Sequence, residues 1–199
     1  MYTKRFWTDV ETTGLYLQKH FAFQMSYLIE EDGRVLHSRT LEMRPDRHGD
    51  YEFSGKAEAV HGFTREKIIS FQPESEAVDL LVGDLEQYGK GRLTFAGYNV
   101  NFDAGFVKAM FYRLGRGNEF YRHFDRMNFD VMQFVQAGRV AGIVPLPHID
   151  LESVCKYFGI NTEGAHHSMT DILNTKAVFD SLSHLFAQVR PLAVENSLT

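Results

Sequence analysis

The chain has 199 residues, of which 44% are apolar and 24% charged, a composition typical of a single globular domain. Lysine and arginine total 21 against 26 aspartate and glutamate residues, and the net charge of −5 argues against binding of nucleic acid or of an anionic membrane through bulk charge. The single cysteine, Cys155, excludes an internal disulfide framework and a cysteine zinc site, and we expect it to be a core thiol.

Strand-like segments come first in the chain. Residues 5–11 indicate one strand, and residues 21–29 alternate between two faces before the turn residues Asp32 and Gly33 and a further strand at residues 35–43. The alternation around a tight turn predicts a β-hairpin. Two later segments, at residues 93–98 and 129–132, are expected to add strands.

Most of the chain after the hairpin is predicted to be helical. The expected helices cover residues 73–88, 101–114, 151–158 and 169–189, the last three ended by Gly115, Gly159 and Pro191. In the first of them, Ala77, Leu80, Leu81, Val82 and Leu85 form the apolar face, and Glu74, Glu76, Asp79 and Glu86 are expected to be solvated.

A hairpin followed by alternating strands and helices predicts an α/β fold, a mixed sheet covered by helices on both faces. Residues 44–55 are expected to form a polar loop within one domain at residues 1–190, followed by a short tail at residues 191–199. The N-terminal residues reach a charge before a signal peptide could form, and no apolar run approaches about 18 residues, so we expect a cytoplasmic protein without a membrane span.

Two acidic residues lie near the end of the first strand. Asp9 and Glu11 point to the same side of an extended chain, about 7 Å apart at Cα, so both carboxylates can converge on one cation. Gly14 allows a tight turn directly afterwards. Two solvated acids at an exposed strand end are the alternative.

A third acid, Asp103, heads the core-facing stripe of the second predicted helix, which continues through Val107, Met110 and Leu114. The helix dipole favours an acid in a first turn by about 0.3–1 kcal/mol, which is the alternative explanation. The dipole does not explain an acid on the apolar face.

The fourth acid, Asp171, falls in the first turn of the last predicted helix, which Ser168 is expected to cap in an S-x-x-D pattern. His166 precedes the helix on a loop. A capping acid and a surface histidine are the alternative. Taken together, four carboxylates and a histidine at element ends are what two-metal phosphoryl chemistry requires, with cations about 3.5–4 Å apart.

Three segments resemble the motifs of the DEDDh 3′–5′ exonucleases, the family of the proofreading subunit of bacterial DNA polymerase III, ribonuclease T and oligoribonuclease. They are residues 6–15 (FWTDVETTGL), 98–103 (YNVNFD) and 166–171 (HHSMTD), and residues 60–64 (VHGFT) resemble a segment of the proofreading branch. The resemblance covers about residues 6–185. It implies a ribonuclease H-like fold, and release of nucleoside 5′-monophosphates from the 3′ end of DNA, with single-stranded or frayed ends favoured.

The resemblance also implies roles for individual residues. Asp9, Glu11 and Asp171 bind the metal that activates water, Asp9 and Asp103 the second metal, and His166 is the general base. The cofactor is two Mg²⁺ ions, which Mn²⁺ can replace. The terminal nucleotides are expected to contact Thr12, Thr13, Gly14, Leu15, His61, Asn99 and Phe102. His167 and Ser168, and the long polar loop at residues 44–55, depart from the family pattern, which puts substrate preference in doubt.

Several alternatives remain open. RNA is a possible substrate, as for ribonuclease T and oligoribonuclease, and the chain could be a homodimer or a polymerase subunit. Residues 182–186 loosely resemble a sliding-clamp-binding peptide, but we expect a freestanding enzyme. Two alternatives come from other functional classes. One is a catalytically silent nucleic-acid-binding module. The other is an iron(II) oxygenase, whose ligands would be His148 and Asp150 with His166 or His184.

Overall fold

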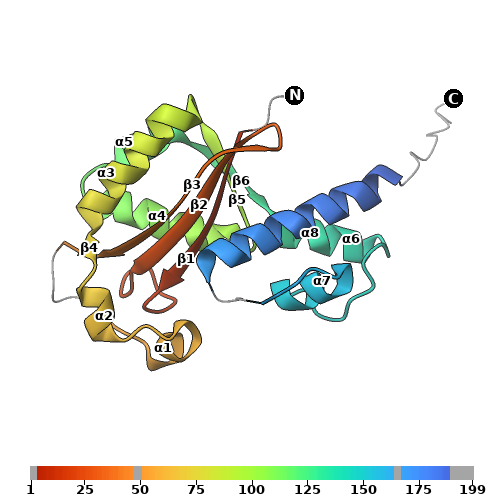
Figure 1. Ribbon diagram of the computed structural model, residues 1–199, viewed down its shortest axis with the longest axis horizontal. Helices are drawn as coiled ribbons and strands as arrows, with labels where there is room; N and C mark the ends of the chain where they lie inside the picture. Colours follow the sequence, from red (N-terminus) through yellow and green to blue (C-terminus); the bar gives the residue numbers. More distant parts are fainter. Residues whose placement is uncertain (1–3, 47–50, 164–166, 189–199) are drawn as a thin grey trace, which may run out of the picture.

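The computed structural model describes residues 4–46, 51–163 and 167–188. A six-stranded mixed sheet lies at the centre of the molecule (Figure 1). Its order is β4-β3-β2-β1-β5-β6. The strands are β1 (Lys4–Thr12), β2 (Ala22–Glu31), β3 (Arg34–Arg44), β4 (Gln72–Pro73), β5 (Leu93–Gly97) and β6 (Phe124–Asp130). Because β1 is antiparallel to β2 and parallel to β5, the predicted α/β fold with a mixed sheet is confirmed.

The predicted hairpin is formed by β2 and β3. Asp32 and Gly33 both have positive φ values, 51° and 83°, as a two-residue turn between right-twisted strands requires. Nine of the ten residues of β2 are buried on one face of the sheet or the other, so β2 is a central strand rather than half-solvated.

Helices cover both faces of the sheet (Figure 1). The helices are α1 (Gly55–His61), α2 (Arg65–Ile69), α3 (Glu74–Asp84), the π-helical turn η1 (Leu85–Gly89), α4 (Val100–Arg113), α5 (Gly117–His123), α6 (Val131–Val140), α7 (Leu151–Phe158) and α8 (Ser168–Gln188). One core, with Phe6 and Tyr27 at its centre, lies under α3, α4 and α5. A second, around Trp7 and Leu182, lies under α6, α7 and α8, so the sheet is a buried middle layer.

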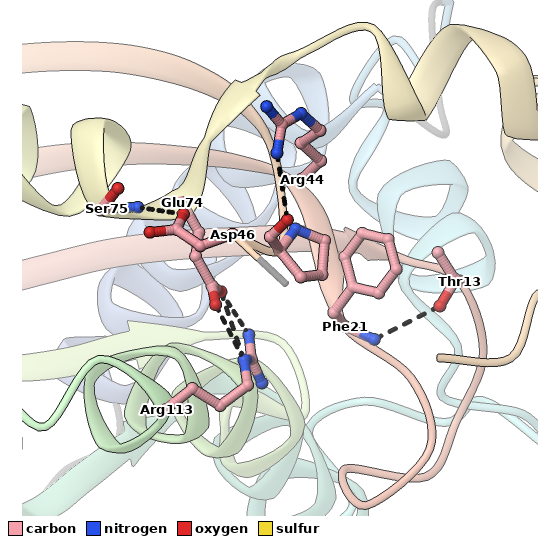
Figure 2. A network of polar contacts seen from close by, with 8 residues as sticks. Thr13, Phe21, Arg44, Asp46, Glu74, Ser75 and Arg113 are labelled. Atoms are coloured by element: carbon pink, nitrogen blue, oxygen red, sulfur yellow. Dashed lines mark hydrogen bonds and ion pairs between the residues drawn. The ribbon is translucent and has the colours of Figure 1, made fainter. Parts of the chain in front are cut away.

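The predicted helix at residues 73–88 is corrected in two respects. Its surface was expected to include Glu74, but this side chain is 3% exposed and its Oε2 lies 2.7 Å from Nη2 of Arg113 on α4 (Figure 2). The ion pair joins the start of α3 to the end of α4, which explains why the acid is buried. Leu80, expected in the core, is 41% exposed.

The strand expected at residues 129–132 begins earlier, because β6 already starts at Phe124. It ends at Asp130, whose carboxylate accepts a hydrogen bond from the backbone N–H of Met132, 3.0 Å away, and so begins α6. Five short elements, α1, α2, α5, α6 and β4, were not predicted. Residues 191–199, expected as a tail, lie outside the described residues. Within the described ranges, no helix is both long and apolar enough to cross a membrane.

Candidate active site

The central strand β1 carries Asp9 and Glu11 at the end where it leaves the sheet. Burial is the main reason that the pKa of Asp9 lies well above its usual value, and the charges of Asp103, Asp171 and Glu11 raise it further. The pKa of Glu11 is raised to about 7, first by burial and then by Asp171. Asp9 therefore lies close enough to Glu11, Asp103 and Asp171 for their charges to act on it.

Asp103 reaches the same place from the other side of the sheet. Its carboxylate is 4% exposed, and its Oδ1 accepts a hydrogen bond of 3.0 Å from the backbone N–H of Val10, the residue between Asp9 and Glu11. Burial raises the pKa of Asp103 to about 8, and the Val10 N–H counteracts this in part. The acid on the apolar stripe is thus fastened to the strand that bears the other two.

Helix α4 holds Asp103 in this position through its first turn. Asn99 caps the helix in the left-handed conformation, with φ 59° and ψ 38°. Its backbone N–H donates to Oδ1 of Asp130, 2.9 Å away at the end of β6. Asp130, which the sequence analysis did not single out, therefore orients the start of two helices at once, α4 through Asn99 and α6 through Met132.

The fourth acid, Asp171, lies in the first turn of α8, as predicted. Ser168 does not cap this helix. It is 1% exposed, and its hydroxyl contacts the Ser26 hydroxyl at 2.7 Å and donates to Oε1 of Gln24 at 2.9 Å, which fastens α8 to β2. His166, expected as the general base, lies outside the described residues.

A cavity of about 360 Å³ opens beside these acids and is lined by Asp9 and Asp171. Its wall includes Tyr98, whose hydroxyl donates to the Ile149 carbonyl, and Asn174, which is 7% exposed one turn beyond Asp171 on α8. Asn174 was missed, because an asparagine within a helix gives no signal in the sequence. Cys155 also lines the cavity, but burial raises the pKa of its thiol to about 11, so the expected unreactive core thiol fits.

The acids fit divalent cations by their chemistry. Carboxylate oxygens are the donors that Mg²⁺ prefers, and the raised pKa values of Asp9, Glu11 and Asp103 show that this cluster lacks compensating positive charge. In the described part of the chain, however, no three histidine, cysteine or acidic side chains already converge on one metal position. Side-chain rotation would have to bring these acids together around a bound cation.

The last residue of β1 and the loop that follows it contain four of the expected nucleotide-binding residues. Thr12 and Thr13 are buried, and their hydroxyls are used within the loop. Oγ1 of Thr12 donates to the Gly14 carbonyl at 2.8 Å, and Oγ1 of Thr13 accepts from the Phe21 N–H at 3.3 Å (Figure 2). Leu15 follows with its side chain 73% exposed, so the loop presents an apolar side chain and backbone rather than hydroxyl groups.

The remaining expected contacts are His61, Asn99 and Phe102. His61 at the end of α1 packs on Phe23, with ring centroids 4.6 Å apart, and its Nδ1 accepts from the Phe63 N–H. Asn99 has an exposed side chain. Phe102 is partly buried against Phe106, at 4.9 Å between ring centroids.

Two alternative readings lose support. Asp150, the acid proposed for an iron site, accepts hydrogen bonds of 2.9 and 2.7 Å from the backbone N–H and the hydroxyl of Ser153 and so caps α7. Leu182, the first residue of the clamp-like peptide, is completely buried in the second core. Leu182 is therefore inaccessible to a clamp in the folded chain.

Comparison with known proteins gives a family match. The model of the RNase_T family, described as exonuclease, matches residues 6–179. The search of curated proteins found no match.

Solved structures with a similar fold include exonuclease I. The E. coli enzyme in complex with a dT13 oligonucleotide is 20% identical, with a TM-score of 0.76, and the match covers 93% of this chain and 43% of that one. The zinc-bound E. coli enzyme with single-stranded DNA is 21% identical, with a TM-score of 0.72, over 93% of this chain and 42% of that one. This chain thus spans less than half the length of these structures, which show the fold alone.

Proposed function

The chain belongs to the exonuclease family, and from that premise we propose that it removes nucleotides one at a time from the 3′ end of single-stranded DNA as nucleoside 5′-monophosphates. The observation that carries the proposal is the placement of Asp9 and Glu11 at the end of β1, with Asp103 bonded to Val10 between them and the pKa of each carboxyl raised. Acids that repel one another in this way are costly without cations. Bound cations would offset this cost, and a phosphodiester is the kind of substrate that such cations bind.

In the proposed site, Asp9, Glu11 and Asp171 would hold one Mg²⁺ ion, and Asp9 and Asp103 would hold the second. Bound divalent ions would lower the pKa of water and neutralise the phosphate oxygens. The carboxylates fix where the scissile phosphate lies, and the Val10 N–H keeps Asp103 oriented toward β1. His166 accepts the proton of the attacking water, a role that its place in the sequence suggests and that lies outside the described residues.

The 3′-terminal nucleotide is proposed to lie over the loop after β1. The exposed Leu15 side chain would pack against its base, and the backbone of Thr12 to Gly14 would face its sugar, since both threonine hydroxyls are already bonded within the loop. His61, Asn99 and Phe102 would contact the neighbouring nucleotide. The preference for single-stranded DNA is supported by the similarity in fold to exonuclease I, which was solved with single-stranded DNA.

A ladder assay tests the proposal. DNA and RNA oligonucleotides labelled at the 5′ end, single and double stranded, are incubated with Mg²⁺, with Mn²⁺ or with chelator. We expect single-stranded DNA to shorten from its 3′ end with either metal and to persist with chelator. Shortening of RNA alone would reassign the enzyme to an exoribonuclease, and an intact substrate under all conditions would refute the exonuclease activity.

A pair of variants on α8 ties the activity to the site. Asp171→Asn should abolish the ladder, whereas Asp180→Asn, on an exposed part of the same helix, should leave it unchanged. Equal activity of Asp171→Asn and the parent would remove Asp171 from the metal site. The same ladder with a polymerase or with single-stranded-DNA-binding protein added tests for a protein partner, as exonuclease I was solved with the SSB C-terminus.

A further inference from the structure

A second groove lies on the side of α4 that faces away from β1. It has a volume of about 490 Å³, within the range of about 300–1,000 Å³ typical of ligand sites. Its walls are α4, α5 and the edge strand β6, and its floor is formed by Phe95, Phe120 and Phe124, all of them buried. The exonuclease site described above uses none of these residues.

The charge of this groove is opposite to that of the chain. Arg92, Lys108 and Arg126 line it with exposed side chains, and Asp125 is its single acid. Oδ2 of Asp125 already accepts a hydrogen bond from the Thr94 hydroxyl, 3.3 Å away. A surface with three cations against one bonded acid, in a chain of net charge −5, is complementary to an anionic ligand.

Aromatic rings stand beside these cations. Nζ of Lys108 lies 5.2 Å from the ring centroid of Tyr121 and 5.7 Å from that of Tyr112, and the two rings are 36% and 53% exposed. The pKa of Tyr121 is lowered, first by hydrogen bonds with Lys108 and Tyr112 and more weakly by the charges of Lys108 and Arg126. Exposed rings beside a cation are an arrangement on which single-stranded nucleic acids stack.

The groove begins at the first turns of α4, the helix that also bears Asp103. At one end of the groove, Nδ2 of Asn128 donates a hydrogen bond of 2.8 Å to Oδ1 of Asn101. Asn101 is two residues before Asp103 in α4. At the neighbouring turn of α4, a Cβ on Gly105 would lie 3.3 Å from Cδ1 of Leu17, which belongs to the loop that presents Leu15. A strand whose 3′ end lies on that loop can therefore cross the start of α4 into the groove.

We propose that this groove binds the single-stranded segment on the 5′ side of the scissile nucleotide, with its phosphates on Lys108 and Arg126 and its bases stacked on Tyr121 and Tyr112. The assignment rests on the proposed exonuclease function. It explains how a chain with excess negative charge holds a polyanion. The two cations act locally, beside a site whose metals would hold the 3′ end.

Two substrates of different length separate the groove from the active site. The p-nitrophenyl ester of thymidine 5′-monophosphate occupies only the active site, whereas a ten-nucleotide DNA strand reaches the groove as well. Lys108→Ala/Arg126→Ala should raise KM for the strand and leave turnover of the ester unchanged. The matched control, Arg34→Ala/Arg139→Ala, removes the same charge from exposed positions that do not line the groove and should change neither.

Binding is measured separately, by fluorescence anisotropy with the strand in chelator. Because each phosphate contact of a single strand contributes about 0.7 to the salt dependence of log K, the Lys108/Arg126 double variant should lower that slope by about 1.4. Tyr121→Ala should weaken binding by at least about fivefold, and Tyr121→Phe, which keeps the ring, should not.

The outcomes are distinguishable. Unchanged strand binding and unchanged KM in the double variant would overturn the groove assignment while the exonuclease function stands. Equal loss on the ester and the strand would also overturn it, because the groove residues would then act on the active site. If the Lys108/Arg126 double variant lost binding to a glutamate-rich peptide but kept its binding to the DNA strand, the groove would be assigned to an acidic protein partner. A parent that hydrolyses neither substrate would refute the exonuclease function, and the anisotropy comparison would still decide the groove.

Discussion

The backbone N–H of Val10 donates a hydrogen bond of 3.0 Å to Oδ1 of Asp103, so a helix-borne carboxylate is fixed to the strand residue that separates Asp9 from Glu11. The two groups are 93 positions apart in the sequence, and both are buried. The bond joins α4 to the central strand at the point where the acids of the site meet. It gives Asp103 a structural role in addition to its proposed role as a metal ligand.

Substitution of Asp103 should separate these two roles. Asp103→Asn keeps an oxygen for the Val10 N–H and removes a repelling charge, so the fold should remain as stable as the parent without metal, while nuclease activity falls by orders of magnitude. Asp103→Ala should lose activity as well and also lower the free energy of unfolding by about 1–3 kcal/mol, because a buried N–H is left without a partner. Urea unfolding and the ladder assay measure the two effects.

If Asp103→Ala unfolded at the same urea concentration as Asp103→Asn, the hydrogen bond from the Val10 N–H would contribute nothing to the free energy of unfolding. An Asp103→Asn variant with parental activity would instead refute the metal assignment.

The site acids could be proposed from the sequence for two reasons. Asp9 and Glu11 lie on one side of a predicted strand and Asp103 falls on an apolar helical stripe, and together with Asp171 and His166 they match the motifs of a known family. Asp130 and Asn174 escaped notice because their places depend on neighbours distant in sequence. The bond from Asn99 to Asp130 spans 31 residues, and no periodicity reveals it.

Helices and strands were predicted correctly where the hydrophobic pattern is long and a turn or capping residue marks its end. The hairpin and helices α4, α7 and α8 agree to within one or two residues, whereas α1, α2 and α5 have only five to seven residues and depend on tertiary packing. The S-x-x-D pattern at Ser168 was misinterpreted as a cap. The same serine hydroxyl can bond within its helix or across to a strand, and here it bonds to Ser26 and Gln24.

The stability of the metal-free protein should fall as the pH rises. Glu11 and Asp103 have pKa values of about 7 and about 8 in the folded chain, against about 4 in an unfolded one. The folded state therefore binds more protons between these values, and its stabilisation is fully present below about pH 4 and lost as the pH passes about 7 to 8. Thermal unfolding in chelator from pH 5 to pH 8.5 measures the decline.

Two comparisons test the cause. Glu11→Gln/Asp103→Asn should flatten the pH dependence, because the titrating groups are gone, and Mg²⁺ should raise the melting temperature of the parent most at the alkaline end, where protons no longer compete. A pH dependence of equal slope in the parent and the double variant would assign the titration to other groups.

His166→Ala should lower the turnover rate by about 10²–10⁴-fold, the usual contribution of a general base, with little change in Mn²⁺ binding measured by calorimetry. The adjacent histidine provides a matched control, since His167→Ala removes an imidazole one position away and should keep most of the activity. Partial recovery of His166→Ala with added imidazole would support proton transfer. Loss of Mn²⁺ binding would show that His166 is a ligand, and equal effects of the two substitutions would refute the specific role.

The loop that presents Leu15 should depend on the close approach of Gly14 to His20. A Cβ on Gly14 would lie 2.3 Å from both Cδ2 and Nε2 of the His20 ring, which is 5% exposed and accepts a hydrogen bond from the Tyr16 N–H at Nδ1. The ring is therefore held in place, and Gly14→Ala should displace the loop, lower the free energy of unfolding by about 1–3 kcal/mol and raise KM.

A double-mutant cycle isolates this contact. His20→Ala alone removes the ring and its hydrogen bond, and Gly14→Ala added to it should cost much less than in the parent, because the obstructing ring is gone. Gly55→Ala is the control for the glycine substitution itself, since a Cβ there has no neighbouring atom within 4 Å. Additive losses of stability in the double variant would mean that Gly14 is needed for its backbone alone. A coupling energy of about 1 kcal/mol or more between the two substitutions, with KM partly recovered in the double variant, would show that the His20 ring determines the position of the loop that presents Leu15.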